Sequence, residues 1–139
     1  MSAYREVQTE FKDAALLVQA LEAVGTHQGN SLQGLVENNK SPVALFGYQG
    51  DEREQKANIV IRRKHVGIAA NDVGFEKVGN KFIARISEYD TRCGYNQKWL
   101  GRVKQEYATL RTIAKARRQG YRVTRERTPE GKVKLVCRR

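Results

Sequence analysis

The segment Asn96–Gln119, NQKWLGRVKQEYATLRTIAKARRQ, decides how the C-terminal half of the chain folds. Its apolar residues recur three and four positions apart, which is the spacing of one face of an α-helix. They are Leu100, Val103, Tyr107, Leu110 and Ala114, with Trp99 and Ile113 widening the stripe. Asn96 can cap the start of the helix, and Gly120 can take the left-handed conformation that ends it. The sequence therefore predicts one amphipathic helix of about six turns, with basic residues beside and opposite its apolar stripe.

The rest of the chain reads mostly as short strands. A strand near residues 4–11 precedes a helix at Ala14–Val24, which Asp13 caps and Gly25 ends. Alternating apolar residues then predict strands at 43–48, 57–62, 66–70, 73–78 and 81–87, and a C-terminal hairpin of residues 121–127 and 132–138. Residues 26–42 are expected to form a loop with a short strand around Leu35, and 49–56 and 88–95 to be connections. This order predicts an α+β fold, with an antiparallel or mixed sheet and two helices on one face, ferredoxin-like with extra strands.

Length and charge suggest one domain with an uneven surface. The 139 residues suit a single domain, residues 1–139. Residues 1–57 carry five Lys and Arg against eight Asp and Glu, whereas residues 58–139 carry 21 against seven. From Arg92 onward the ratio is 15 to three. Such asymmetry indicates a polyanionic partner, namely nucleic acid, a ribonucleoprotein or an acidic protein face, or else a basic surface that only maintains solubility.

Several classes of protein are not expected. No apolar run approaches the roughly 20 residues that span a bilayer, and the N-terminal MSAYREVQTE lacks the apolar stretch of a signal peptide. Cys93 and Cys137 do not have the spacing of a metal-binding pair, and reduced thiols in a cytoplasmic compartment are expected. We recognise no arrangement of catalytic residues. A non-enzymatic protein without cofactor or metal is predicted.

Two groups of cations are candidate binding sites. The first lies on the long helix and the hairpin after it, which are consecutive, so their charges can converge on one phosphate-binding surface. Its residues are Arg102, Arg111, Lys115, Arg117, Arg118, Arg122, Arg125, Lys132, Lys134 and Arg138. The second group is Arg62, Arg63 and Lys64, at a turn between strands. For each group the alternative is an ordinary solvated surface.

An ordered set of motifs gives the chain a family resemblance. It comprises MSAYREVQTEFKD at 1–13, ALEAVG at 20–25, GYQGD at 47–51, ANIVI at 57–61, DVGF at 72–75, QEYA at 105–108 and GYRV…PEGKVKLV within 120–136. In these motifs the chain resembles the family of the hypothetical chloroplast reading-frame protein thirty-five, the domain-of-unknown-function family twelve fifty-seven. It departs from that family at Ala3, where members often carry His. The resemblance implies a small α+β protein of one domain, found in the cytoplasm, a plastid stroma or a phage-infected cell. It implies no settled activity.

Three functions remain open at this point. The first is a non-enzymatic, basic accessory protein that binds nucleic acid or a ribonucleoprotein through the C-terminal helix and hairpin. The second is an adaptor or structural subunit that docks on an acidic protein partner. The family resemblance implies an AAA-type ATPase as one such partner, because genes of the family often neighbour those of ring-forming ATPases. The third is a small-molecule-binding protein or enzyme with a pocket that the sequence does not reveal.

Overall fold

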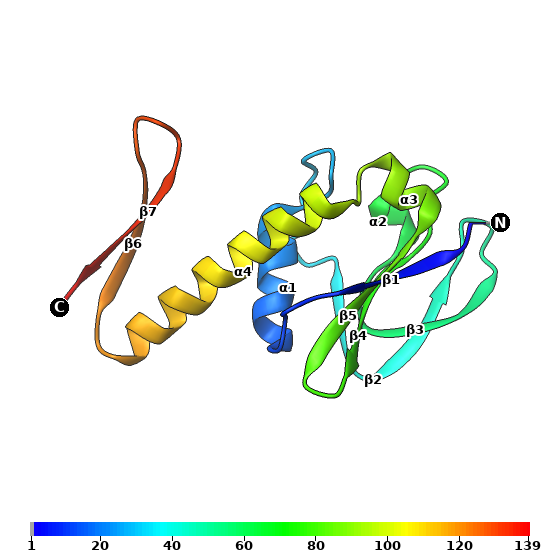
Figure 1. The fold of residues 1–139 in the computed structure, drawn as a ribbon, viewed down its shortest axis with the longest axis horizontal. Helices are drawn as coiled ribbons and strands as arrows, with labels where there is room; N and C mark the ends of the chain where they lie inside the picture. Colours follow the sequence, from blue (N-terminus) through cyan, green and yellow to red (C-terminus); the bar gives the residue numbers. More distant parts are fainter. Residues whose placement is uncertain (1) are drawn as a thin grey trace. The chain divides into compact units, whose positions relative to one another are not determined.

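The computed structural model describes residues 2–139 and confirms the α+β class (Figure 1). The chain divides into two compact units, Met1–Tyr107 and Ala108–Arg139, and the boundary falls inside a helix. We call them unit 1 and unit 2. The division into two units does not test whether the chain folds as one domain, so the single domain expected from the sequence stays a prediction.

Unit 1 carries most of the secondary structure, and unit 2 consists of the end of one helix and a hairpin. The bounds are β1 Tyr4–Gln8, α1 Ala14–Val24, β2 Val36–Phe46, β3 Glu52–Ile61, α2 Arg63–Val66, β4 Val73–Val78, β5 Lys81–Ser87, α3 Glu88–Cys93, α4 Gln97–Arg118, β6 Arg122–Arg127 and β7 Val133–Arg138. Among the described residues, none of the helices has the length and apolar character that crossing a bilayer requires.

The sheet of unit 1 is antiparallel throughout, with the strand order β1-β5-β4-β3-β2. Strands β2 to β5 form a meander, because each pairs with the next along the chain. Strand β1 joins at the β5 edge, where Tyr4 lies opposite Ser87. The tight turn predicted at Gly79-Asn80 joins β4 to β5, with Val78 opposite Lys81. Strands β1 and β2 are therefore the two edges of the sheet.

Helix α1 has the bounds that its sequence predicts. The Asp13 Oδ1 atom accepts a hydrogen bond of 3.0 Å from the Leu16 amide, which satisfies one of the free amides of the first turn. At the other end, Gly25 has a φ of 77° and donates its amide to the Leu21 carbonyl at 2.9 Å. Leu17 and Leu21 are fully buried, so one face of the helix contributes to the core.

Both predicted ends of α4 are confirmed. The Asn96 side-chain oxygen accepts a hydrogen bond of 3.2 Å from the Trp99 amide, as a helix cap does. After the last turn, Gly120 has a φ of 88°, and the Tyr121 amide reaches back to the Ala116 carbonyl at 3.1 Å. This six-to-one bond across a left-handed glycine is the Schellman arrangement. The helix therefore begins and ends where local chemistry dictates.

The unit 1 half of α4 packs into the core. Trp99 and Val103 are fully buried, and the Phe11 and Tyr107 rings lie 4.9 Å apart. The Tyr107 hydroxyl also accepts hydrogen bonds from the backbone amides of Lys12 and Asp13, at 3.1 and 3.0 Å. The apolar stripe that predicts the helix thus anchors it beside the start of α1.

The other face of the sheet carries a smaller apolar cluster of Leu45, Ala57 and Val60. Gly74 allows β4 to approach this cluster, because a Cβ atom at that position would lie 2.5 Å from the Ala57 Cβ atom. Any larger residue at position 74 would force Ala57 or Leu45 to shift. This cluster gives the sheet a second buried layer.

The structure corrects the expected start of two strands. Strand β2 starts at Val36, not near residue 43, and β3 starts at Glu52, not at residue 57. Residues 36–42 and 52–56 are mostly polar, so they resemble loops by composition. In β3 the residues from 52 to 56 alternate between exposed and half-buried, which is the pattern of a strand whose one face meets solvent.

Two connections also differ from expectation. Residues 66–70 were predicted as a strand, and this was wrong. Val66 is buried at the end of α2, whereas Ile68 is 97% exposed and Ala69 has a φ of 56°, so the segment turns. The second difference is α3, which occupies most of the connection expected at 88–95. The Ser87 side chain caps α3 by accepting a hydrogen bond of 3.0 Å from the Asp90 amide.

Candidate nucleic-acid interface

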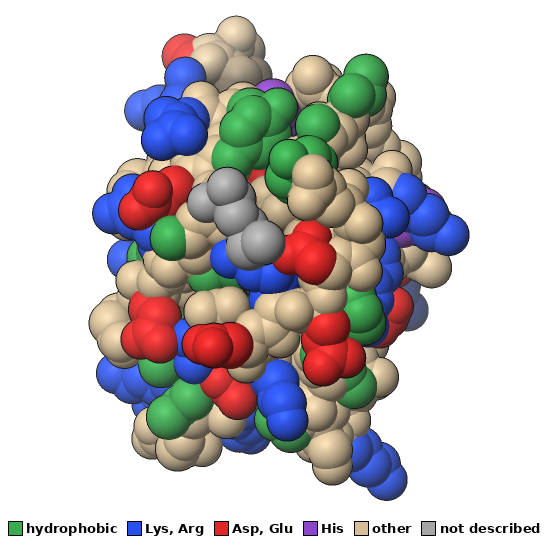
Figure 2. All heavy atoms as spheres, turned by 90° about the vertical axis from the view of Figure 1, so that its right-hand side faces the viewer, with side chains coloured by type: hydrophobic (Ala, Val, Ile, Leu, Met, Phe, Trp, Pro, Cys, Tyr) green, Lys and Arg blue, Asp and Glu red, His purple; other side chains and the backbone are tan. Residues whose placement is uncertain are grey.

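Unit 2 holds most of the excess positive charge of the chain. Its 32 residues include eleven Lys and Arg and only two Asp and Glu, which gives a net charge of +9. Unit 1 carries fifteen Lys and Arg against thirteen Asp and Glu. Figure 2 shows one face of the molecule, on which acidic and basic side chains are interspersed. Two carboxylates cannot neutralise eleven cations, so unit 2 must present uncompensated positive charge to solvent.

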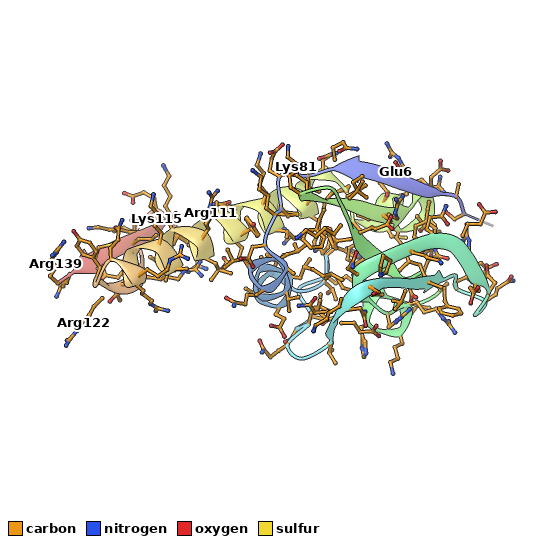
Figure 3. All side chains as sticks on the ribbon, turned by 90° about the horizontal axis from the view of Figure 1, so that it is seen from below. Glu6, Lys81, Arg111, Lys115, Arg122 and Arg139 are labelled. Carbon is orange, nitrogen blue, oxygen red and sulfur yellow. The ribbon has the colours of Figure 1, made fainter. Side chains whose placement is uncertain are left out.

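The helical part of unit 2 places three cations along one side. Arg111, Lys115 and Arg118 are four and three positions apart, which brings them to the same face of α4. All three are exposed, and Figure 3 shows Arg111 and Lys115 following one another along the helix. Arg117 is exposed as well. Leu110 and Ala114 of the apolar stripe are only half-buried here.

The hairpin of unit 2 distributes its cations over both faces. The register pairs Arg122 with Arg138 and Glu126 with Lys134, which places these four side chains on one face of the two-stranded sheet. Arg125 lies opposite Leu135 and therefore points to the other face. That second face also carries the apolar residues Val123, Val133 and Cys137 and the basic residue Arg127.

The two ends of the hairpin are held by specific contacts. At the turn, the Lys132 amide donates to the Thr128 hydroxyl at 3.1 Å, and the Thr128 amide donates to the Lys132 carbonyl at 2.9 Å. At the open end, the Arg139 guanidinium lies 4.8 Å from the centre of the Tyr121 ring and donates to its hydroxyl at 3.3 Å. The side chain of Lys132 is exposed. These contacts hold the basic strands in register.

The remaining predicted residues lie in unit 1. Arg102 is exposed on the first half of α4. Arg62 is bound instead to two acids: its guanidinium pairs with Glu37 at 2.7 Å and with the buried carboxylate of Asp72 at 2.8 Å. The Arg62 guanidinium also holds the pKa of Glu37 below its usual range through a direct hydrogen bond. We therefore leave Arg62 out of the proposed interface, because its charge is already compensated.

Asp72 is the buried acid that pairs with Arg62. Its side chain also accepts hydrogen bonds from the backbone amides of Phe46 and Arg63, at 2.8 and 2.7 Å. This carboxylate accepts from three donors and so connects β2 and the residues directly after β3 to the turn before β4. No local sequence signal marks it, since Arg62 and Glu37 are distant in the chain. Its role is structural.

Arg63 and Lys64 flank this ion pair at the surface. Both are exposed, and Arg63 donates to the Tyr48 carbonyl at 2.9 Å. Together with Arg62, Phe46 and Asp72 they line a pocket of about 440 Å³. The pocket therefore contains a buried acid beside its cations. Among the described residues, no group of three His, Cys, Asp or Glu side chains is placed to hold a metal ion.

Comparison with known proteins places the chain in a family. The family described as "Protein of unknown function (DUF1257)" matches residues 30–136. The chain belongs to this family. No curated protein and no solved structure matches it. The DUF1257 match extends from the segment before β2 almost to the end of β7, so it includes residues of both units. The family's description names no activity.

Two tyrosines of this DUF1257 protein, the half-buried Tyr4 and the buried Tyr95, make its stability sensitive to alkali. The Tyr4 hydroxyl donates to the Asp72 carbonyl at 2.6 Å, and the Tyr95 hydroxyl donates to the Val66 carbonyl at 2.7 Å. Burial raises the pKa of Tyr95 from 10.0 to about 12, and burial together with the negative charge of Asp72 raises the pKa of Tyr4. The folded state thus retains protons that the unfolded state releases.

We expect the contribution of these two tyrosines to the free energy of unfolding to be constant up to about pH 9 and to fall as the pH rises through about 10 to 12. The sign follows from the raised pKa values, because stability from such groups is complete below the unfolded pKa and is lost above it. Urea titrations at a series of pH values measure the effect. Tyr95→Phe should reduce this pH dependence, because it removes the hydroxyl whose pKa burial raises. A flat profile up to pH 12 would contradict the burial of both hydroxyls.

Proposed function

We propose that this protein is a non-enzymatic accessory protein that binds nucleic acid through unit 2, with little preference for sequence. The observation that carries the proposal is the net charge of +9 on 32 residues. Binding to a phosphate backbone requires several Lys and Arg side chains on a continuous structural element, because each neutralised phosphate releases condensed counterions. Helix α4 and the hairpin supply such side chains in consecutive segments.

The arrangement favours phosphate contacts over reading of bases. Arg111, Lys115 and Arg118 form a row on a helix, and Arg122, Lys134 and Arg138 share one face of the hairpin. Tyr121 is the single aromatic residue in unit 2, and its ring is already covered by Arg139. Sequence-tolerant stacking on unpaired bases depends on exposed aromatic side chains. The proposed contacts are therefore electrostatic.

Charge reversal of the helical row tests the proposal. The triple variant Arg111→Glu, Lys115→Glu, Arg118→Glu lowers the net charge of unit 2 from +9 to +3. These side chains are exposed, so the fold should persist in circular dichroism. We expect affinity for a short DNA or RNA duplex, measured by fluorescence anisotropy, to fall at least about tenfold.

A matched triple variant in unit 1 controls for net charge. Lys40, Lys56 and Lys77 are exposed, and replacing all three by Glu changes the total charge by the same amount. This variant should weaken binding by less than about threefold. Equal losses in both variants would show that total charge alone attracts nucleic acid. Absence of binding to either duplex at low salt would refute the proposal.

A further inference from the structure

One edge of the sheet in unit 1 opens onto a groove. Strand β1 pairs with β5 on one side, and no described strand pairs with its other side. Figure 3 shows β1, with the labelled Glu6, at a rim of the sheet. The Glu88 amide donates to the Ala3 carbonyl at 2.8 Å. In the alternation of an antiparallel ladder, the backbone N–H and C=O groups of residues 3, 5 and 7 therefore point to β5. The backbone groups of Tyr4, Glu6 and Gln8 then point to the free edge.

The groove runs between this edge and the first turns of α4. Two adjoining hollows of about 430 and 350 Å³ share Val7, Gln97 and Leu100 in their walls. Val7 is half-buried and Leu100 is 7% exposed, which gives the groove an apolar floor. An edge strand beside a hollow with an apolar floor is the geometry that accepts an added peptide strand.

Gly101 leaves the helix wall of this groove open. It is exposed, and a Cβ atom at that position would have no neighbouring atom within 4 Å. Glycine lowers helix stability in a helix interior. Nothing in the packing of unit 1 requires it here, whereas a strand lying along β1 would have room beside it.

The charges around the groove indicate what it binds. Arg5, Lys98 and Lys104 are exposed in its walls. The acid among the lining residues, Glu10, is paired with Lys81 at 3.4 Å. The rim is therefore positive, and it complements an acidic segment. A second copy of the chain would bring an equally positive rim against this one, which disfavours pairing between two copies.

The opposite edge of the sheet is built differently. Strand β2 contains Pro42, and its register with β3 shifts between Asn38 and Val43. Proline and irregular pairing are features that prevent an edge from accepting another strand. Strand β1 has neither a proline nor a register shift against β5. The contrast singles out β1 as the edge that is open to pairing.

We propose that the free edge of β1 and residues 97–104 of α4 bind an acidic, extended peptide segment of a partner protein as an additional strand of the sheet. This site lies within unit 1 and does not depend on nucleic-acid binding by unit 2. The backbone of the bound segment would pair with Tyr4, Glu6 and Gln8. Its acidic side chains would meet Arg5, Lys98 and Lys104, and its apolar side chains would contact Val7 and Leu100.

Selection from a random library of linear peptides, with the full chain as bait, tests the proposal. We expect enrichment of peptides in which acidic and apolar residues lie two positions apart, because Arg5 and Val7 share one face of β1 and residues two positions apart share one face of the added strand. Affinity of a selected peptide, measured by anisotropy, should fall at least about tenfold with Gly101→Met, because the side chain fills the groove. Gly101→Ala is the matched control and should bind normally. Lys98→Glu with Lys104→Glu should also weaken binding.

Backbone methylation distinguishes strand pairing from other modes of binding. Methylating every second amide of the selected peptide should abolish binding in one frame and have little effect in the other, because only one edge of the peptide pairs with β1. The proposal is overturned if no acidic peptide is enriched, if Gly101→Met binds as well as Gly101→Ala, or if both methylation frames behave alike. Dimerisation of the chain that Gly101→Met abolishes would assign the groove to a second copy instead and would equally overturn it.

Discussion

The variant Trp99→Ala should lose about 3–5 kcal/mol of the free energy of unfolding. Many small domains have a total stability of about 5–15 kcal/mol, so this loss is a large fraction of what keeps unit 1 folded. Trp99 is fully buried, and its ring meets Tyr95 edge to face with centroids 4.9 Å apart. Its indole nitrogen donates to the Gly25 carbonyl at 3.0 Å, which joins α4 to the end of α1. Alanine would leave a cavity and an unsatisfied buried carbonyl.

Urea denaturation followed by circular dichroism measures this loss. Trp99→Phe is the informative partner variant, because a phenyl ring keeps part of the ring contact while it loses the hydrogen bond and some buried volume, so its loss of stability should be smaller than that of alanine. Ile68→Ala serves as a control, since Ile68 is 97% exposed and should change stability by no more than about 0.5 kcal/mol. A Trp99→Ala protein within about 1 kcal/mol of the wild type would show that the α4 anchor is misplaced.

The second large effect is the salt dependence of nucleic-acid binding. For duplex DNA, log affinity falls by about 0.9 per phosphate contact per decade of salt. Four to six contacts by the cations of unit 2 would therefore cost roughly two to three decades of affinity between about 50 and about 200 mM salt. Eleven Lys and Arg side chains in unit 2 are sufficient for that number of contacts.

Anisotropy titrations of one labelled duplex at several salt concentrations give the slope directly. The triple variant of Arg111, Lys115 and Arg118 should show a shallower slope than the wild type, because fewer counterions are released. Its unit 1 counterpart, with Lys40, Lys56 and Lys77 reversed, should retain the wild-type slope. An affinity that does not change with salt would contradict an electrostatic interface.

The parts of the fold that sequence predicts well are those with local signals. Helix α1, strands β4 and β5 and the long helix have caps, turns or periodic apolar residues of their own, and their bounds agree with expectation. The starts of β2 and β3 lack such signals, because polar residues there pair in the ladder while facing solvent. At residues 66–70 the apolar pattern predicts a strand that does not form, because Ile68 alternates with Val66 and Ala70 but lies on an exposed turn.

The same distinction applies to the candidate sites. The charge of unit 2 is a property of composition, so it can be counted directly from the amino-acid sequence. Arg62 belongs to the same kind of basic cluster in sequence, yet its partners Glu37 and Asp72 come together only through pairing of β2, β3 and β4. The groove beside β1 is likewise absent from any local motif, because strand and helix meet there from opposite ends of unit 1.

A nuclear magnetic resonance titration of the full chain with a short duplex, at about 50 mM salt, tests the central claim most directly. Amide resonances are followed residue by residue, so binding and its location are measured together. The account predicts that shifts concentrate in residues 108–139, above all around Arg111–Arg118 and the hairpin strands, and that they reverse when salt is raised. Shifts confined to unit 1, or no shifts at all, would contradict it.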